Sequence, residues 1–324
     1  MSSWIDVPDL AAEIWRLVDQ VPPGQVTTYG DIARRLGDVK GAASVAELLL
    51  DHQHTSECRC HRVVRAGGAI GLYGDGGSER KAERLQTEGV PVVDEAVPAG
   101  LIWATFPPGP GPLERLRDFQ NSVPTRLSLA ATGIRPPTIG ALDVAYPRPG
   151  IALGAYALLD ADTLELLWSR TIETAVTFPY IPGYLTFREL PVLEALWREV
   201  LAEDRAGEVV MIDGNGILHP RRAGIAATFG LLAEVPTIGV TKSRLCGQIV
   251  GDLEPLVPSA VMDGDELLGA AIAPATGSAK PIFVSPGNLL GIEDATRITL
   301  STFRDHRVPE PIYHADRLSK GRGA

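Results

Sequence analysis

The sequence predicts an α/β protein in which a mixed sheet has helices on both faces and follows a small, mainly helical, winged-helix-like domain. Three observations support this class. Apolar residues follow helical spacing before residue 96, and strand-like runs alternate with amphipathic helical stretches after residue 112. Between them, residues 96–112 are rich in Pro and Gly, fit neither period and are predicted to be a linker. We therefore expect domains at residues 1–95 and 113–324.

Helices dominate the first domain. Residues 10–21 have the spacing of an amphipathic helix, residues 22–37 fit a turn followed by a short helix, and residues 41–52 fit a third helix. A loop with His and Cys residues follows. A mainly helical domain with short connections is therefore expected.

Strands open the second domain. Residues 138–146, 150–160 and 163–174 are three strand-like runs separated by turn residues. After them, helices are expected at residues 187–203, 223–235 and 295–306, and strands at residues 208–213, 236–241 and 281–287. Three sequential strands followed by alternating helices and strands imply a mixed sheet with helices on both faces.

The composition limits the partners. Apolar residues make up 45% and charged residues 22% of the chain, as in soluble globular proteins. No apolar run is long enough to cross a membrane, the first residues lack the layout of a secretory signal, and three cysteines do not make a disulfide framework. A cytoplasmic protein without a membrane partner is therefore expected. The net charge of −10 is unfavourable for binding a phosphate backbone. Phosphate contacts are therefore expected only from local basic sets such as Arg221 with Arg222.

A stiff loop presents an aromatic side chain between two prolines. Tyr180 and Ile181 lie between Pro179 and Pro182, and proline fixes φ and removes a backbone donor. Tyr180 is therefore expected on a rigid, non-helical loop shortly before Glu189. A ring on such a loop can enter a nucleic-acid stack. The alternative is an ordinary Pro-rich loop with a packed tyrosine.

Three carboxylates of the second domain are candidate metal ligands. Asp143 occupies the interior of an apolar strand, where an Asp is unusual, and Asp213 ends a buried strand before a Gly-rich loop. Glu189 opens the helix behind the proline loop. Carboxylate oxygens favour Mg²⁺ or Mn²⁺, which would polarise a phosphoryl oxygen and activate a water. For Asp213 alone, capping of a turn is the commoner explanation.

Four long motifs occur in order along the second domain. They are PYIPGYLTFRE (residues 179–189), IDGNGILHPRRAG (212–224), PTIGVTKSRLCG (236–247) and RVPEPIYHAD (307–316). These motifs resemble endonuclease V, a deoxyinosine-directed nuclease with a ribonuclease-H-like fold, over roughly residues 112–318. The resemblance implies Mg²⁺-dependent cleavage of the second phosphodiester bond 3′ to deoxyinosine in double- or single-stranded DNA. Such cleavage leaves 3′-hydroxyl and 5′-phosphate ends.

The resemblance also assigns roles to single residues. It implies that Asp143 and Asp213 bind the metal and that Glu189 is the third catalytic carboxylate. It places Lys242 near the scissile phosphate and Tyr180 in the gap left by the everted base. The other residues assigned to DNA contact are Pro179, Ile181 and Arg221, and those assigned to the base pocket are Gly214, Leu245, Cys246 and Gly247. Weak pairing of hypoxanthine lowers the cost of extruding the base.

One position departs from the pattern of that family. After the strand VSPGN, where the family usually has a histidine, this chain has Asn288. An amide oxygen can ligate a metal or hold a water, but it cannot accept a proton near neutral pH. Asn288 is therefore expected at the metal, with cleavage that survives but is slower.

The first domain contains a second ordered set of motifs. The segments VPPGQVTTYGDIARRLG (residues 21–37), CHRVV (60–64) and LQTEGV (85–90) resemble the DNA-binding domain of O6-alkylguanine-DNA alkyltransferases and their alkyltransferase-like relatives. The resemblance covers roughly residues 8–92. It implies that Cys60 is the alkyl acceptor, that His61 activates it and that Glu88 orients the histidine. It also implies that Tyr29 helps to rotate the nucleotide out.

Departures within the first domain leave two functions open. Arg59 stands where a proline normally precedes the cysteine, and Ala43 and Ser44 stand where an arginine normally enters the DNA stack. The chain thus keeps the acceptor, Cys60, and lacks the intercalating arginine. Both alkyl transfer through Cys60 and DNA binding without transfer are consistent with this pattern.

Zinc binding is a third interpretation of the same loop. Five residues with zinc-ligating side chains follow one another closely: His52, His54, Cys58, Cys60 and His61. Their spacing differs from that of a standard zinc finger.

Together the motifs predict a DNA-repair protein in which an alkyltransferase-like domain precedes an endonuclease V domain. Two alternatives remain for the second domain. One is a binding protein for damaged DNA without catalysis, and the other is a ribonuclease that acts on inosine in RNA.

Overall fold

Two compact units make up the chain. The computed structural model describes residues 3–55, 57–74, 76–275 and 280–322. The smaller unit consists of Val7–Arg117 and Thr177–Tyr184, and the larger unit of Met1–Asp6, Asp118–Val176 and Leu185–Ala324.

The smaller unit is mainly helical, as predicted. Its helices are α1 (Leu10–Val18), α2 (Tyr29–Leu36), α3 (Ala42–Leu50) and α4 (Gly77–Thr87), and it also contains most of α5 (Pro112–Ser122). Thr28 caps α2 by accepting a hydrogen bond from Asp31 N, and Gly37 ends it in the left-handed region with φ +109°. Two short strands, β1 (Thr27–Thr28) and β2 (Val63–Val64), pair in parallel.

The predicted linker is largely part of the smaller unit. Val97 is only 2% exposed and belongs to a core cluster with Val26 and Val64. Backbone bonds join Val26 N to Leu101 O and Trp103 N to Val26 O, next to the 3-10 helix η4 (Ala99–Leu101). The predicted boundary at residue 95 is therefore wrong. The Pro- and Gly-rich composition indicated a linker, but the segment packs into the core through Val97.

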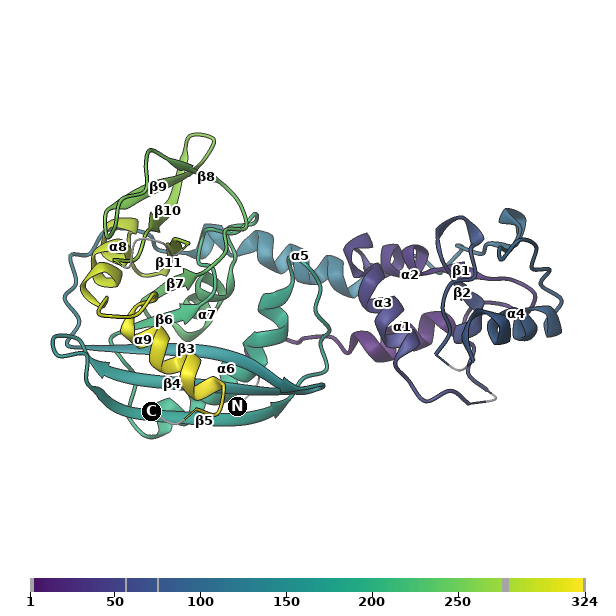
Figure 1. Cartoon of the computed structure of the whole chain (residues 1–324), viewed down its shortest axis with the longest axis horizontal. Helices are drawn as coiled ribbons and strands as arrows, with labels where there is room; N and C mark the ends of the chain where they lie inside the picture. Colours follow the sequence, from purple (N-terminus) through teal and green to yellow (C-terminus); the bar gives the residue numbers. More distant parts are fainter. Residues whose placement is uncertain (1–2, 56, 75, 276–279, 323–324) are drawn as a thin grey trace. The chain divides into compact units, whose positions relative to one another are not determined.

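A nine-stranded mixed sheet forms the larger unit (Figure 1). Its strands are β3 (Thr138–Arg148), β4 (Ile151–Asp160), β5 (Leu166–Ala175), β6 (Val209–Asp213), β7 (Thr237–Thr241), β8 (Gln248–Val250), β9 (Pro258–Asp263), β10 (Glu266–Ile272) and β11 (Ile282–Asn288). The order is β5-β4-β3-β6-β7-β11-β10-β9-β8. The central pairs β3–β6 and β6–β7 are parallel, and the outer pairs are antiparallel.

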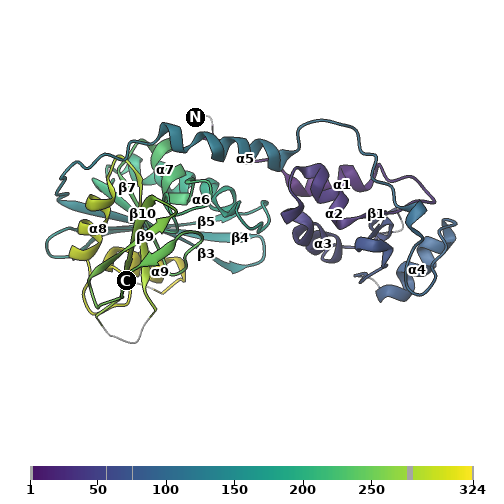
Figure 2. The same ribbon diagram turned by 90° about the horizontal axis from the view of Figure 1, so that it is seen from above.

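Helices cover both faces of this sheet, which confirms the predicted fold class. On one face α6 (Leu185–Ala202) and α7 (Ile225–Ala233) pack through the buried rings of Trp197 and Phe229. On the other, α8 (Ile292–Ser301) and α9 (Glu310–Ser319) pack through Ile298 and Ile312. Figures 1 and 2 show α9 lying along β3 on the face opposite α6.

Several elements were not expected from the sequence. Strands β8, β9 and β10 extend the sheet edge, and helices α4, α5 and α9 were not assigned. Helix α8 spans Ile292–Ser301, so the expected helix at residues 295–306 was placed too late in the chain. No helix among the described residues is long and apolar enough to cross a membrane.

Candidate functional site

Two aspartates stand side by side at the centre of the sheet. Strands β3 and β6 run parallel with Leu142 opposite Ile212, so the next residues, Asp143 and Asp213, occupy the same level on neighbouring strands. Asp143 is 9% exposed. Burial and the charge of Asp213 raise the pKa of Asp143 to about 6. The two carboxylates that were predicted from separate motifs therefore interact.

Helix α9 adds two side chains that were not identified from the sequence. The Ser319 hydroxyl, which is fully buried, donates a hydrogen bond to Asp143 Oδ2. Asp316 lies one turn earlier, and its carboxylate is 2.7 Å from Lys320 Nζ and 3.2 Å from Lys242 Nζ. The available signal was the last of the four motifs, which ends at Asp316.

Lys242 connects the acidic groups. It follows β7, and its Nζ lies 3.2 Å from Asp213 Oδ2 and 3.2 Å from Asp316 Oδ1. Burial alone would lower the pKa of Lys242, but the two aspartates outweigh it and raise the pKa. The pKa of Asp213 is raised because burial outweighs the attraction of Lys242. The site therefore holds more negative than positive charge when its carboxylates ionise.

Glu189 lies in the second turn of α6 and is partly buried. Burial, and then the charges of Asp143 and Asp213, raise the pKa of Glu189 to about 8. The neighbouring Arg188 opposes this rise only in part. The electrostatic coupling places the third predicted carboxylate within range of the other two.

Asn288 lies toward the other end of β7 from the aspartates. Strand β11 runs antiparallel to β7 and pairs Asn288 with Thr237, whereas Asp213 is level with the opposite end of β7. Asn288 Oδ1 accepts from Ser128 N at 3.0 Å, and Nδ2 donates to Gly230 O at 2.9 Å. The prediction that Asn288 is a metal ligand beside the aspartates is therefore wrong. Its amide holds backbone groups in place.

Tyr180 projects from a loop that folds with the smaller unit. Ser44 Oγ donates to the carbonyl of Tyr180 at 2.8 Å, and the Tyr184 hydroxyl donates to Asp38 Oδ2 at 2.8 Å. The loop is thus anchored at both ends, while Tyr180 itself is 59% exposed. An exposed ring on an anchored loop favours the stacking interpretation over a packed tyrosine.

The other predicted DNA-contact residues are more enclosed. Ile181 is 1% exposed, and Pro179 is partly buried. Arg221 Nη1 donates to Gln120 Oε1 at 3.2 Å. Ile181 therefore anchors the loop by packing, and a DNA contact through Arg221 has to compete with its bond to Gln120.

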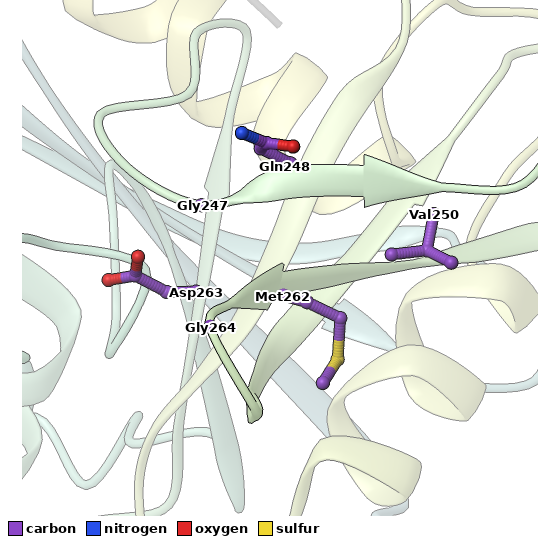
Figure 3. A pocket seen from close by; sticks show the side chains of 6 residues that line it. All are labelled: Gly247, Gln248, Val250, Met262, Asp263 and Gly264. Atoms are coloured by element: carbon purple, nitrogen blue, oxygen red, sulfur yellow. The ribbon is translucent and has the colours of Figure 1, made fainter.

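A cavity of about 450 Å³ lies beside one predicted base-pocket residue (Figure 3). It is lined by Gly247, Gln248, Val250, Met262, Asp263 and Gly264. Gly247 has φ +73°, and an added Cβ would lie 2.9 Å from Met262 O, so a side chain has no room there.

The other base-pocket residues do not line this cavity. Leu245 is 53% exposed, and the sulfur of Cys246 lies 3.8 Å from Arg222 Nη1. Gly214 follows β6, where an added Cβ would come within 2.3 Å of Ile225 Cγ2. Gly214 therefore serves close packing behind Asp213.

The smaller unit holds the Cys60 site at the start of the 3-10 helix η2 (Cys60–Arg62). Cys60 is 3% exposed; its sulfur lies 3.0 Å from Cys58 Sγ, within hydrogen-bond distance, and 3.4 Å from His54 Nδ1. The bond to Cys58, together with burial, raises the pKa of Cys60. The same bond lowers the pKa of Cys58 to about 5.

His61 pairs with Glu88 as predicted. Its Nε2 lies 2.9 Å from Glu88 Oε1, and its Nδ1 lies 3.2 Å from Cys58 O. Burial outweighs Glu88 and lowers the pKa of His61. Arg62 Nε binds the other Glu88 oxygen at 2.8 Å. Both ring nitrogens of His61 are engaged, so activation of Cys60 by direct contact requires a rearrangement.

Tyr29 and Lys81 lie close to this cysteine. Tyr29 begins α2 and is partly buried, and burial followed by the charge of Cys60 raises its pKa. Lys81 Nζ donates to Val63 O at 2.6 Å, and burial lowers the pKa of Lys81 to about 8. Lys81 was not identified from the sequence because a lysine in an amphipathic helix normally faces water.

The carboxylate site suits a hard divalent cation. Its donors are carboxylate oxygens, and burial together with mutual repulsion raises the pKa values of Asp143, Asp213 and Glu189, so added positive charge is favoured there. In the described part of the chain, the group of three or more residues whose ligand atoms already lie close enough to share an ion is another set, namely His52, His54, Cys58 and Cys60. The carboxylates therefore have to adjust when a cation binds.

Both halves of the chain match known families. Residues 121–317 match the endonuclease V family, and residues 9–90 match the DNA-binding domain of 6-O-methylguanine DNA methyltransferase. A bifunctional methyltransferase/endonuclease of Picrophilus torridus is 31% identical over 298 residues, covering 92% of each chain.

Solved structures are similar to the larger unit. Endonuclease V from Streptomyces avermitilis is 31% identical with a TM-score of 0.57, and the match covers 68% of this chain and 95% of that one. Endonuclease V from Ciona intestinalis, in complex with a 24-mer DNA containing an inosine followed by a ribo-adenosine, is 25% identical with a TM-score of 0.58. That match covers 64% of this chain and 96% of the other.

Proposed function

Because this chain belongs to the endonuclease V family and has an alkyltransferase DNA-binding domain before its nuclease domain, we propose that it nicks DNA beside deaminated adenine. The nicked bond is the second phosphodiester 3′ to deoxyinosine. The relative from Ciona intestinalis, crystallised with inosine-containing DNA, supports this substrate. The observation that carries the proposal is the pair Asp143 and Asp213 on neighbouring parallel strands, with Lys242 bonded to Asp213.

Each side chain of the site has a distinct task. Asp143 and Asp213 hold Mg²⁺, with Mn²⁺ as a substitute, and Ser319 orients the Asp143 carboxylate. The bound ion supplies positive charge for a phosphoryl oxygen and makes a water more acidic. Lys242 attracts the scissile phosphate, and its bond to Asp316 keeps the ammonium group in position.

Glu189 is the proposed proton acceptor of the site. At neutral pH the Glu189 carboxyl group stays protonated in the metal-free protein, because its pKa is raised to about 8. Positive charge beside it favours the ionised form, which can accept a hydrogen bond or a proton from the attacking water. Glu189→Gln is therefore expected to bind DNA and to nick it poorly.

Tyr180 occupies the gap left by the extruded base. Its exposed ring can stack on the neighbouring bases, which offsets part of the stacking lost when the base leaves the helix. The bonds from Ser44 and Tyr184 fix the loop, so little ordering is needed on binding.

A nicking assay tests the proposal against its two alternatives. Matched duplex DNA, single-stranded DNA and RNA, each with one inosine or one adenosine, are incubated with Mg²⁺ or with EDTA. We expect Mg²⁺-dependent nicking of inosine DNA, and none by Asp213→Asn. Binding without nicking would favour a damage-binding protein, and preferential cleavage of RNA would favour a ribonuclease.

Alkyl transfer is a second candidate function, favoured by the His61–Glu88 pair beside Cys60. In that reaction the Cys60 sulfur bonds to the alkyl carbon, the bond from that carbon to guanine O6 breaks, and the released guanine takes up a proton. Transfer of a labelled methyl group to the wild type, and not to Cys60→Ala, is the test. If the wild type stays unlabelled while it binds O6-methylguanine DNA, the smaller unit acts by binding alone.

A further inference from the structure

We propose that His52, His54, Cys58 and Cys60 form a zinc site in the alkyltransferase-like domain. All four offer a ligand atom, and these atoms lie within 4.8 Å of one another. Two thiolates and two neutral imidazoles match the donor set that selects Zn²⁺ over hard cations. The fifth residue with a ligating side chain, His61, is excluded because its ring nitrogens face Glu88 and Cys58 O.

The distances between the ligand atoms are near those of a tetrahedral site. His52 Nε2 lies 3.0 Å from Cys58 Sγ, Cys58 Sγ lies 3.0 Å from Cys60 Sγ, and Cys60 Sγ lies 3.4 Å from His54 Nδ1. Zinc–sulfur bonds of about 2.3 Å at the tetrahedral angle place two sulfurs about 3.8 Å apart. The two sulfurs therefore have to separate by less than about 1 Å for an ion to enter between them.

The surroundings hold both imidazoles in place. The rings of His52 and His54 lie with centroids 4.0 Å apart. Trp15 packs edge-on against His52 at 4.7 Å, and Tyr73 lies 4.5 Å from His54. These aromatic neighbours reduce the rotamer freedom that the histidines would otherwise lose on binding an ion.

The backbone of Cys58 is held by a helix, and the site has a path from solvent. Arg84 Nη2, on α4, donates to Cys58 O at 2.9 Å, so the segment before Cys60 is tied to a helix. A cavity of about 490 Å³ opens beside His52 and Cys58 and is also lined by Trp15 and Asp19. An ion can therefore reach His52 and the sulfur of Cys58 without unfolding of the domain.

Charge also favours an ion at this position. The sulfurs of Cys58 and Cys60 lie 3.0 Å apart, and two thiolates so close would repel each other unless a proton or a cation lies between them. A zinc ion replaces that proton and balances both thiolates, which gives a neutral site with two imidazoles.

Zinc at this site has a consequence for Cys60. A buried sulfur that is bound to zinc is not a free thiolate. Cys60 would therefore accept an alkyl group either as a zinc-bound thiolate or after it has left the zinc. The zinc site does not rest on the nuclease function, because its ligands all lie in the smaller unit.

Metal analysis of the full-length protein tests the site. The protein is purified under reducing conditions, incubated with excess zinc and freed of unbound metal by gel filtration. We expect one zinc per chain in the wild type and loss of that zinc in Cys58→Ser. The matched control is Cys246→Ser, which removes the remaining cysteine and should keep the zinc. Asp213→Asn should keep it as well, because its carboxylate belongs to the nuclease site.

A second measurement needs no variant. Replacing zinc by Co²⁺ should give the sulfur-to-cobalt charge-transfer absorption of a tetrahedral thiolate site. Mass spectrometry after alkylation should find Cys58 protected with zinc and modified after chelation, while Cys246 is modified in both states. Absence of zinc from the wild type, zinc retained by Cys58→Ser, or a disulfide between Cys58 and Cys60 under reducing conditions would overturn the proposal.

Discussion

Binding of Mg²⁺ to the nuclease site should release protons in an amount set by Glu189 and Asp143. The pKa of Glu189 is about 8 and that of Asp143 is about 6, and both values lie well above those of ordinary carboxyl groups. A divalent cation beside them favours their ionised forms. Metal binding should therefore expel whatever protons these two groups hold at the working pH.

The expected amount follows from the two values. At pH 7, Glu189 is about nine-tenths protonated and Asp143 about one-tenth, so these two groups together release about one proton for each ion bound. At pH 9, Glu189 is only about one-tenth protonated, so its share of the release falls to about 0.1. In Glu189→Gln the release at pH 7 should be lower than in the wild type by about 0.9 proton, because the share of Glu189 is lost.

Calorimetric titration of the DNA-free protein with Mg²⁺ measures this release. Repeating the titration in buffers of different ionisation enthalpy gives the number of protons per ion. The reasoning is refuted if the release is the same at pH 7 and pH 9, or the same in the wild type and Glu189→Gln.

The same carboxyl group should affect stability without metal. Because the pKa of Glu189 is raised in the folded state, its stabilising contribution is full below about pH 4.5 and is lost as the pH rises through about 8. Glu189→Gln lacks this titration. Its melting temperature relative to the wild type should therefore increase from about pH 6 to about pH 9, and a constant difference would contradict the raised pKa.

Three further substitutions separate binding, positioning and folding. Tyr180→Ala should weaken binding of an inosine duplex by about 1–3 kcal/mol of stacking, while Tyr180→Phe keeps most of it; equal losses would exclude stacking. Asp316→Ala should slow nicking about 10- to 100-fold, because Lys242 loses one of its two carboxylate partners, and an unchanged rate would remove Asp316 from the site. Asn288→Ala should lower unfolding free energy by about 1–3 kcal/mol for each backbone group left unpaired, with little change in the nicking rate of folded protein. A much higher Mg²⁺ requirement for nicking in that variant would restore Asn288 to the metal site.

The sequence was sufficient for the fold class, and it also indicated the three carboxylates, whose catalytic role stays a prediction. A mid-strand Asp143 and a strand-terminal Asp213 are local signals, because a buried acid in an apolar run needs a partner. Their neighbourhood on parallel strands was not predicted and comes from the observed pairing of β3 with β6. Family resemblance indicated Lys242, and the two prolines around Tyr180 indicated a rigid loop.

What the sequence did not provide depends on register and on contacts distant along the chain. Asn288 was expected at the metal because it stands where the endonuclease V family usually has a histidine, but the antiparallel pairing of β11 with β7 places it toward the other end of β7. Ser319 and Asp316 reach the site only because α9 packs along β3. Such packing leaves no local pattern in the residues concerned.

The first domain shows the same limit. His61 and Glu88 were placed together by family resemblance, and the structure pairs them. The contact between Cys60 and Cys58, which raises the pKa of the expected acceptor, depends on the loop conformation. Spacing between the cysteines indicated ligands but gave no distances.

The most direct test of the account is the position of the nick. A duplex with one inosine and a labelled strand is incubated with the wild type or Asp213→Asn, and the products are sized to one nucleotide. The account predicts a single Mg²⁺-dependent product that ends at the second phosphodiester 3′ to inosine and is absent with Asp213→Asn. An equal yield from Asp213→Asn, or equal nicking of the adenosine duplex, would contradict it.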